Sequence, residues 1–307
     1  MPYAPTITPF LDSAPCPRVE VFFEEFAPGT ETVTVYRTAA NREFLVRGAV
    51  EAATAGALTR IDFECPFNVP VTYRAEMFDG DGLSLGFTDP TTLGEQYEAD
   101  DAPEDDEFTA LFPGGPIGFG LLSASSWLHN PLDPQGAVRV QAVLGSAASL
   151  SRPVSGTISR PLGRRVGVML SRGRTGLSGF TYDIHCDTLA QADKVQAMLG
   201  TYTNTTVPVL CLRMGGDESR LRVPQPLFMG VLDIAEEMQD VQYGGEWTIQ
   251  RMTGDEVAPP TPGLFIPLLT NADLKAYYAT NAAMKADNAT NAALSRRYDL
   301  SGFAGGA

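Results

Sequence analysis

Hydrophobic and polar positions alternate most regularly between Gly179 and Cys186. Phe180, Tyr182, Ile184 and Cys186 fall on one face of this segment, and Thr181, Asp183 and His185 fall on the other. A period of two residues is typical of a half-buried strand. The sequence therefore predicts a strand here.

A helix over residues 188–200 is predicted directly after this strand. Thr188-Leu-Ala-Gln191 has the spacing of a capping box, in which both polar side chains satisfy amides at a helix start. Apolar residues at helical spacing follow, namely Leu189, Ala192, Val195 and Leu199. Gly200 stands where a left-handed C-cap is expected. The apolar runs Val207–Arg213 and Leu227–Ile234 predict further strands, and the first is apolar enough to be buried on both faces.

Short apolar runs separated by turn residues fill the chain from Arg18 to Thr88. The predicted strands are Val19–Phe26, Thr32–Arg37, Glu43–Ala49, Leu58–Glu64, Val71–Phe78 and Leu83–Thr88. Short strands at this spacing predict a β-sandwich over residues 18–90, and Tyr73 stands where a tyrosine corner could form. Asp79-Gly-Asp-Gly82 favours a tight hairpin turn over a calcium loop, because no glutamate follows at EF-hand spacing.

The other domain boundaries follow from shifts in composition. Five prolines in residues 1–17 predict an extended N-terminal arm, and residues 91–118 form an acidic linker or insertion loop. Residues 119–258 form a second β domain, with strands at Ala137–Leu144 and Glu246–Met252 among others. The content of 30 glycines and 23 prolines favours a mainly β chain with many turns.

Residues 259–307 are predicted to form a proline-rich linker and a C-terminal helix from Asn271 to Tyr298. This segment is rich in alanine and contains the near-repeats Ala279–Met284 and Ala289–Leu294. Two hypotheses remain open for this helix. Either its apolar and asparagine positions form a coiled-coil seam, or it is a short solvated helix docked on its own domain.

Charge is distributed unevenly along the chain. The net charge of −15 argues against a nucleic-acid-binding protein, which needs a basic face. Residues 95–107 contain eight acidic residues and no Lys or Arg, whereas residues 151–174 contain arginines and no acidic residue. These arginines are Arg152, Arg160, Arg164, Arg165, Arg172 and Arg174.

This inversion of charge has two interpretations. Each segment can be a solvated face, or the two can pack head to tail between copies of the chain. On the second interpretation, the candidate interface residues are Arg160, Arg164, Arg165, Arg172, Arg174, Glu104, Asp105, Asp106 and Glu107. Exposed ion pairs contribute only about 0.2–1 kcal/mol each, so they would set orientation more than affinity.

The sequence offers no active site, metal site or cofactor site to nominate. His129 and His185 are far apart, and neither a phosphate-binding loop nor a nucleophile motif is present. Cys16, Cys65, Cys186 and Cys211 have no paired spacing, and we expect buried free thiols. Three aromatic residues could stack on sugars, although burial is the commoner outcome for tryptophan: Trp127, Trp247 and Phe265. No run is long enough for a transmembrane helix and the N-terminus has no secretory signal, so we expect a protein made in the cytoplasm that inserts into no membrane.

Several segments together resemble a known family. Val71–Ser84 resembles the last strands of a fibronectin type III domain. In their order along the chain, further segments resemble the minor tail proteins of tailed bacteriophages that infect actinobacteria: Val46–Ala49, Ile61–Phe67, Val69–Ala75, Trp127–Leu132, Pro161–Arg164, Gly230–Asp233 and Glu246–Ile249. The resemblance covers about two thirds of the chain.

This resemblance implies a virion component of the distal tail, synthesised in the cytoplasm of the host. It implies a fibronectin type III-like sandwich followed by a β-barrel with one packed helix, similar to tail tubes. We expect a structural, non-enzymatic protein that forms a ring or collar, as a trimer or hexamer, and contacts other tail-tip proteins and possible host surfaces. The alternative is an adhesin-like module that binds a cell-wall glycan or receptor, and a third hypothesis is an enzyme that cuts cell-wall polymer.

Overall fold

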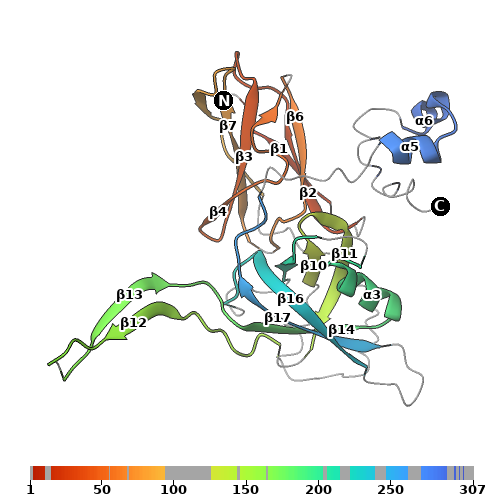
Figure 1. Ribbon diagram of the computed structural model, residues 1–307. Coiled ribbons are helices and arrows are strands. Elements are labelled where there is room, and N and C mark those ends of the chain that lie inside the picture. Colours follow the sequence, from red (N-terminus) through yellow and green to blue (C-terminus); the bar gives the residue numbers. More distant parts are fainter. Residues whose placement is uncertain are drawn as a thin grey trace.

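The structure of the protein is a computed structural model in which the chain is mainly β. It describes residues 3–10, 15–54, 56–67, 69–93, 126–143, 146–163, 165–202, 206–214, 222–238, 247–261 and 271–288, together with Leu294, Arg297 and Leu300. The buried hydrophobic residues form two cores, one within a pair of sheets and one within a barrel (Figure 1).

The first core lies between two antiparallel sheets. One sheet has the order β1-β2-β6, built from β1 (Thr6–Phe10), β2 (Arg18–Phe23) and β6 (Leu58–Asp62). The other has the order β4-β3-β7-β8, with two short strands beside it: β3 (Thr32–Ala39), β4 (Arg42–Leu45), β5 (Ala52–Ala53), β7 (Val71–Phe78), β8 (Ser84–Phe87) and β9 (Thr91–Leu93). Every second residue of β7 is buried, as alternation requires of a strand that covers a core on one face. The predicted β-sandwich is therefore present, and β7 has the predicted bounds.

The second core fills a closed barrel. Its strands pair in the order β10-β11-β14-β17-β16-β15, with β10 (Ser126–Asn130), β11 (Asp133–Ala142), β14 (Phe180–Cys186), β15 (Val209–Arg213), β16 (Leu227–Met238) and β17 (Thr248–Glu256). The predicted alternation of β14 is confirmed, because Phe180, Tyr182, Ile184 and Cys186 are buried and the residues between them are not. Strand β15 is also buried on both faces as predicted, since Leu210 and Leu212 join the barrel core while Cys211 and Arg213 are covered on the opposite face.

Helix α3 (Leu189–Ala197) packs on the barrel and begins as predicted. The Thr188 hydroxyl accepts a bond of 3.2 Å from the Gln191 amide, and the Gln191 side chain accepts one of 2.9 Å from the Asp187 amide. The predicted end at Gly200 is wrong, because α3 ends at Ala197 with Met198 as its C-cap. The Met198 carbonyl accepts a bond from the Asn130 side chain. Gly200 does adopt the expected left-handed conformation, at φ +96°. Leu189 is exposed, so the apolar face consists of later residues: Ala192, Val195 and Met198.

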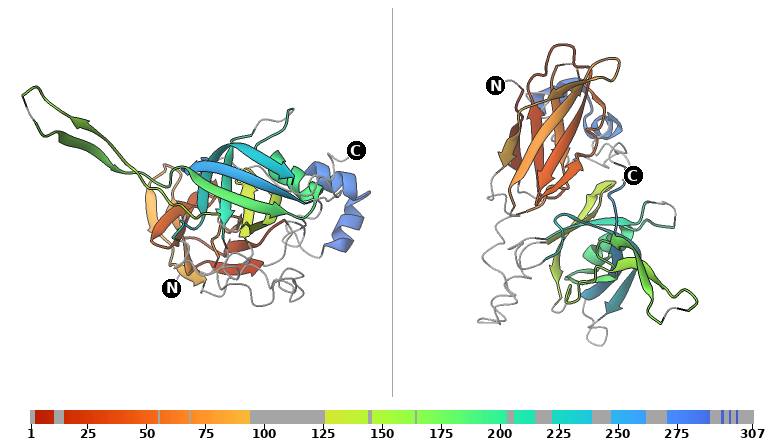
Figure 2. Two further views of the ribbon diagram at one scale, coloured as in Figure 1. Left: turned by 90° about the horizontal axis from the view of Figure 1, so that it is seen from below. Right: turned by 90° about the vertical axis from the view of Figure 1, so that its left-hand side faces the viewer.

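A hairpin of two strands leaves the barrel between β11 and β14. It consists of β12 (Val154–Ser159) and β13 (Val168–Arg174), which pair with each other and with no other described strand. Figures 1 and 2 show it as a thin arm that points away from both cores.

The C-terminal segment differs from its prediction. It contains two helices, α5 (Asn271–Tyr277) and α6 (Asn281–Asp287), so the single helix predicted from Asn271 to Tyr298 is wrong. The chain is extended at Thr280, whose hydroxyl accepts a bond of 3.1 Å from the Ala283 amide and caps α6. Threonine favours caps over helix interiors because its side chain competes for backbone groups.

The C-terminal sequence repeats every ten residues as Thr-Asn-Ala, beginning at Thr270, Thr280 and Thr290. Both helices start at the Asn of a repeat.

Two smaller predictions have different outcomes. The Asp79–Gly82 turn is confirmed, since the Asp79 side chain accepts bonds from the amides of Asp81 and Leu83 at 3.0 and 2.8 Å. The tyrosine corner is not formed as predicted, because the Tyr73 hydroxyl donates to the Asp62 carboxylate rather than to the backbone. Within the described ranges, no helix is long and apolar enough to cross a membrane.

Candidate functional site

The predicted basic interface lies on the hairpin of β12 and β13. The side chains of Arg160, Arg165, Arg172 and Arg174 are exposed there. Arg164 lies outside the described residues, and so do Glu104, Asp105, Asp106 and Glu107. The predicted pairing of the arginines with the acidic segment therefore stays a prediction.

The hairpin also exposes hydrophobic side chains on both of its faces. Leu170 pairs with Thr157 and Val168 with Ser159, so Leu170 and Val168 share one face. Ile158 and Met169 pair on the opposite face, where they are 63% and 58% exposed. Val154, Leu162 and Val166 are exposed as well. A hairpin with apolar side chains on both faces would gain by burial on both, at about 25 cal/mol for each Å² removed from water.

The base of the hairpin is fixed to the barrel. The Thr175 amide donates to the Pro153 carbonyl at 2.9 Å, and the Ser178 amide donates to the Ser151 carbonyl at the same distance. Leu177, which follows the hairpin, is buried in the barrel core, and its amide donates to the Glu256 carboxylate. The exposed arm therefore starts from an anchored base.

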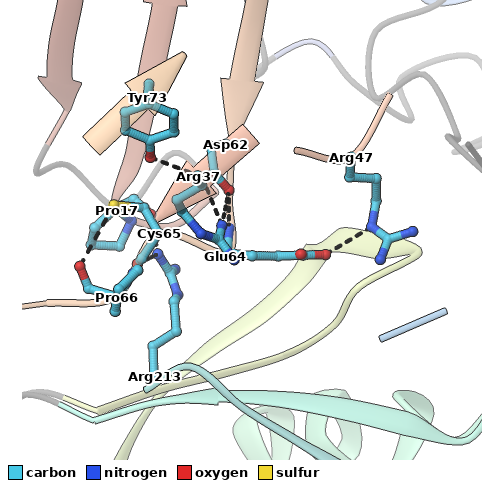
Figure 3. Close-up of polar contacts among 9 residues, drawn as sticks. All are labelled: Pro17, Arg37, Arg47, Asp62, Glu64, Cys65, Pro66, Tyr73 and Arg213. Carbon is cyan, nitrogen blue, oxygen red and sulfur yellow. Dashed lines mark hydrogen bonds and ion pairs between the residues drawn. The ribbon is translucent and has the colours of Figure 1, made fainter. Parts of the chain in front are cut away.

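A cluster of buried polar residues joins the sandwich to the barrel (Figure 3). On the sandwich side, the Arg37 guanidinium contacts both oxygens of Asp62 at 2.7 Å, and Tyr73 donates to the same carboxylate at 2.9 Å. Arg213 rises from β15, and its Nη1 donates to the carbonyls of Pro17 at 2.8 Å and Cys65 at 3.3 Å. The guanidinium of Arg213 also lies 4.7 Å from the centre of the Phe67 ring.

Further contacts cross this domain junction. Arg47 bonds to Glu64 at 2.7 Å and also donates to the carbonyls of Pro260 and Thr261, each at 3.1 Å. Arg42 pairs with Glu256 at 3.2 Å. Phe44 from the sandwich meets Phe228 from the barrel, and Trp127 of β10 packs into the sandwich core. The two domains are therefore joined by polar and apolar contacts.

Burial controls the protonation of the groups at the junction. Burial alone would lower the pKa of the Arg37 guanidinium, but the charge of Asp62 outweighs it and the pKa is raised. Burial raises the pKa of Glu64 against the opposing charges of Arg47 and Arg37. Burial lowers the pKa of His129 well below its usual range, and Arg213 and Arg47 lower it further. The charged groups on the sandwich side of the junction are therefore paired with one another, whereas His129 on the barrel side is neutral near pH 7.

The cysteines are buried free thiols, as predicted. Burial raises the pKa of Cys65 to about 12 and that of Cys186 to about 11, so neither forms a reactive thiolate at neutral pH. Burial raises the pKa of Cys211 as well. Among the described residues, no group of three or more His, Cys, Asp or Glu side chains is placed to hold a metal ion.

The three aromatic residues considered for sugar stacking have different outcomes. Trp127 is buried, in accordance with the commoner outcome for tryptophan. Trp247 is half-buried and lies against His185 in a tilted arrangement, with ring centres 5.1 Å apart. Phe265 lies outside the described residues.

Sequence reasoning missed the domain junction, although a signal for it is present. Arg37 occupies an inward position of β3, in phase with Val33 and Val35, and Arg213 ends the apolar run of β15. A charged residue at a buried position of a strand must find a partner. That rule could have identified both arginines, but not the residues they contact.

Comparison with protein-family models gave no match, and no curated protein and no solved structure is significantly similar to the chain.

Proposed function

We propose that this protein is a structural, non-enzymatic subunit of a bacteriophage tail tip that assembles with further copies of itself into a ring or collar. The single observation that supports assembly is the hairpin of β12 and β13, which projects from the barrel with exposed arginines and exposed apolar residues. The sandwich followed by a barrel with one packed helix agrees with the fibronectin type III-like and tail-tube-like domains that the resemblance implies.

The hairpin has the chemistry of an interface rather than of a solvated surface. An isolated two-stranded hairpin is only marginally stable in water. Single exposed apolar residues are ordinary, whereas a projecting element with such residues on both faces marks an interaction site. The arginines add a positive field without any acidic residue in segment 151–174, so a negatively charged partner surface is favoured.

In this proposal the positive hairpin of one copy approaches a negative surface of the next. The acidic residues of segment 95–107, including Glu104, Asp105, Asp106 and Glu107, supply negative charge on every copy. Because the donor and acceptor surfaces differ, the contact is heterologous, and it closes into a trimer, a hexamer or another ring when the rotation permits. Other tail-tip proteins and the host surface are its further proposed partners.

Reversing charge on the hairpin tests this proposal. We expect the wild-type protein to form a closed oligomer whose population falls with rising salt, because exposed ion pairs are screened. The double variant Arg172→Glu/Arg174→Glu should be monomeric at concentrations where the wild type assembles. Native mass spectrometry across a salt series gives both results.

Lys194→Glu is the control, because it makes the same kind of charge reversal, once instead of twice, at an exposed position of α3 away from the hairpin. This control should assemble normally. Unchanged assembly of the Arg172/Arg174 variant would contradict the proposal. A monomer at every salt concentration, together with saturable binding to actinobacterial envelopes, would instead favour the adhesin-like function.

A further inference from the structure

The edge of the sandwich at β8 carries a second exposed apolar surface. Leu83, Leu85 and Phe87, here called the β8 patch, are 68%, 41% and 48% exposed. They lie on or beside the last strand in the order β4-β3-β7-β8, and no described strand pairs with the outer side of β8. Edge strands are usually protected by charged side chains, because an open edge invites pairing. Three apolar residues at an open edge therefore suggest a covered surface in the assembled protein.

Acidic residues surround the β8 patch. Asp79 and Asp81 form the turn that leads into it, and Glu31 lies against that turn at Gly80. Glu76 lies beside Phe87 in the register of the sheet and accepts a bond of 2.8 Å from Ser84. The neighbouring acidic residues outnumber the nearby Arg74, whose guanidinium is 4.4 Å from the Phe87 ring centre and is paired with Glu43. The patch is therefore an apolar strip with a negative rim.

The hairpin of β12 and β13 has the opposite charge and the same apolar character. Its exposed Ile158 and Met169 share one face and can cover the β8 patch, while its arginines meet the acidic rim. Apolar contact would supply affinity, and the charges would select the orientation. We propose, on the basis of the ring assembly proposed above, that the hairpin of one copy docks on the β8 patch of a second copy.

The hairpin and the β8 patch lie on different domains of the chain, so each copy can offer one surface to each of two neighbours. The hairpin starts from the barrel and points away from the sandwich, as the views in Figures 1 and 2 show. Its base is fixed by backbone bonds at Pro153 and Ser151. Every copy thus has one hairpin, which leaves the barrel, and one β8 patch, which lies on the sandwich, and two different surfaces on each copy are what a head-to-tail ring needs.

Site-specific cross-linking tests this contact in the full-length protein. The native cysteines are all buried, so an engineered surface cysteine is the accessible thiol. Met169→Cys and Leu85→Cys are prepared as separate single variants, mixed, and treated with a short bismaleimide. We expect a covalent dimer in the mixture and little in either variant alone, because only the mixture places a hairpin thiol against a β8 thiol.

Leu232→Cys supplies the matched control, since Leu232 is 89% exposed but lies on the barrel strand β16. Mixed with Met169→Cys, it should give no dimer. No dimer with Leu85→Cys, or an equal yield with Leu232→Cys, would overturn the docking on β8.

A second variant separates this inference from the proposed function. Leu85→Asp should weaken self-association about tenfold or more and leave the thermal unfolding midpoint nearly unchanged, because the side chain is exposed. If Arg172→Glu/Arg174→Glu abolishes the oligomer while Leu85→Asp does not, the β8 docking fails and the ring stands. If neither variant changes assembly, both proposals fail.

Discussion

His129 shows how a single buried side chain can couple the fold to pH. It lies on β10 with no exposed surface, and neither ring nitrogen has a hydrogen-bond partner among the described residues. Burial and the positive charges of Arg213 and Arg47 disfavour its protonated form. The unfolded chain has no such restriction, and its histidine titrates near a pKa of about 6.5.

The sign of the pH effect follows from this difference. Below about pH 6.5 the unfolded state binds a proton that folded His129 does not, so the free energy of unfolding falls as pH falls. The slope approaches about 1.4 kcal/mol per pH unit and continues down to the lowered pKa of the folded state. His129→Phe removes this slope, so its stability relative to the wild type should rise steadily below pH 6.5.

Urea unfolding of the wild type and His129→Phe at a series of pH values measures this difference. Glu64 acts in the opposite sense, because burial raises its pKa against Arg47 and Arg37, but it is present in both proteins and cancels in the comparison. Parallel pH curves for the two proteins would show that His129 is not the source of the acid sensitivity.

At the scale of an element, the hairpin is attached to the fold without contributing to its cores. Neither hydrophobic core contains a residue of β12 or β13. A Cβ on Gly156 would lie 2.6 Å from the Leu170 carbonyl oxygen, so the two strands approach closely only because this residue is glycine. The hairpin is therefore stabilised by the pairing of β12 with β13 and by any partner surface that covers it.

Deletion of the hairpin should separate assembly from folding. The Thr175 amide and the Pro153 carbonyl are 2.9 Å apart, so two glycines can replace Val154–Arg174 without straining the base. We expect the free energy of unfolding of the monomer to change by no more than about 1 kcal/mol, because the removed side chains are exposed. Denaturant unfolding and native mass spectrometry should show a folded protein that no longer assembles, and a large loss of stability would place the hairpin in the folded core instead.

The predictability of the elements depended on whether their signal is local. The alternation of β14, the cap at Thr188 and the Asp79 turn each lie within a few residues, and the sequence was sufficient to predict them. The break between α5 and α6 is also determined by neighbouring residues, because Thr280 caps α6. The prediction of a single helix gave more weight to the alanine content than to this cap. The partners of Arg213 and the exposed state of Ile158 depend on residues far along the chain, so no periodicity reveals them.

At the scale of the whole molecule, the domain junction makes the sandwich and the barrel depend on each other. Arg213 leaves the barrel and is buried under backbone carbonyls of the sandwich, and Trp127 completes the sandwich core from a barrel strand. Removing either domain would leave these groups exposed or without these contacts. The two domains are therefore expected to unfold in one cooperative transition.

Replacing Arg213 tests this coupling. Arg213→Met keeps a long apolar stem and removes the bonds to Pro17 and Cys65, so it should cost about 1.5–3 kcal/mol and broaden or split the calorimetric transition. Arg251→Met is the matched control, because Arg251 pairs with Asp183 and Glu237 on the exposed surface of the barrel, where such pairs contribute little. A single sharp transition in Arg213→Met, shifted no more than in the control, would contradict the coupling.

The ten-residue spacing of the C-terminal Thr-Asn-Ala repeats has a consequence for how this end of the chain can change in length. The unit that begins at Thr280 brings its own helix start, and α5 begins at the Asn of the preceding unit. Duplication of the unit that begins at Thr280 would add a helix with its own cap, whereas loss of Thr280 alone would remove the cap of α6. Threonine is disfavoured inside a helix, so in-frame changes of whole units are the tolerated ones. The segment can therefore vary in steps of one unit, as a spacer does, without altering the sandwich or the barrel.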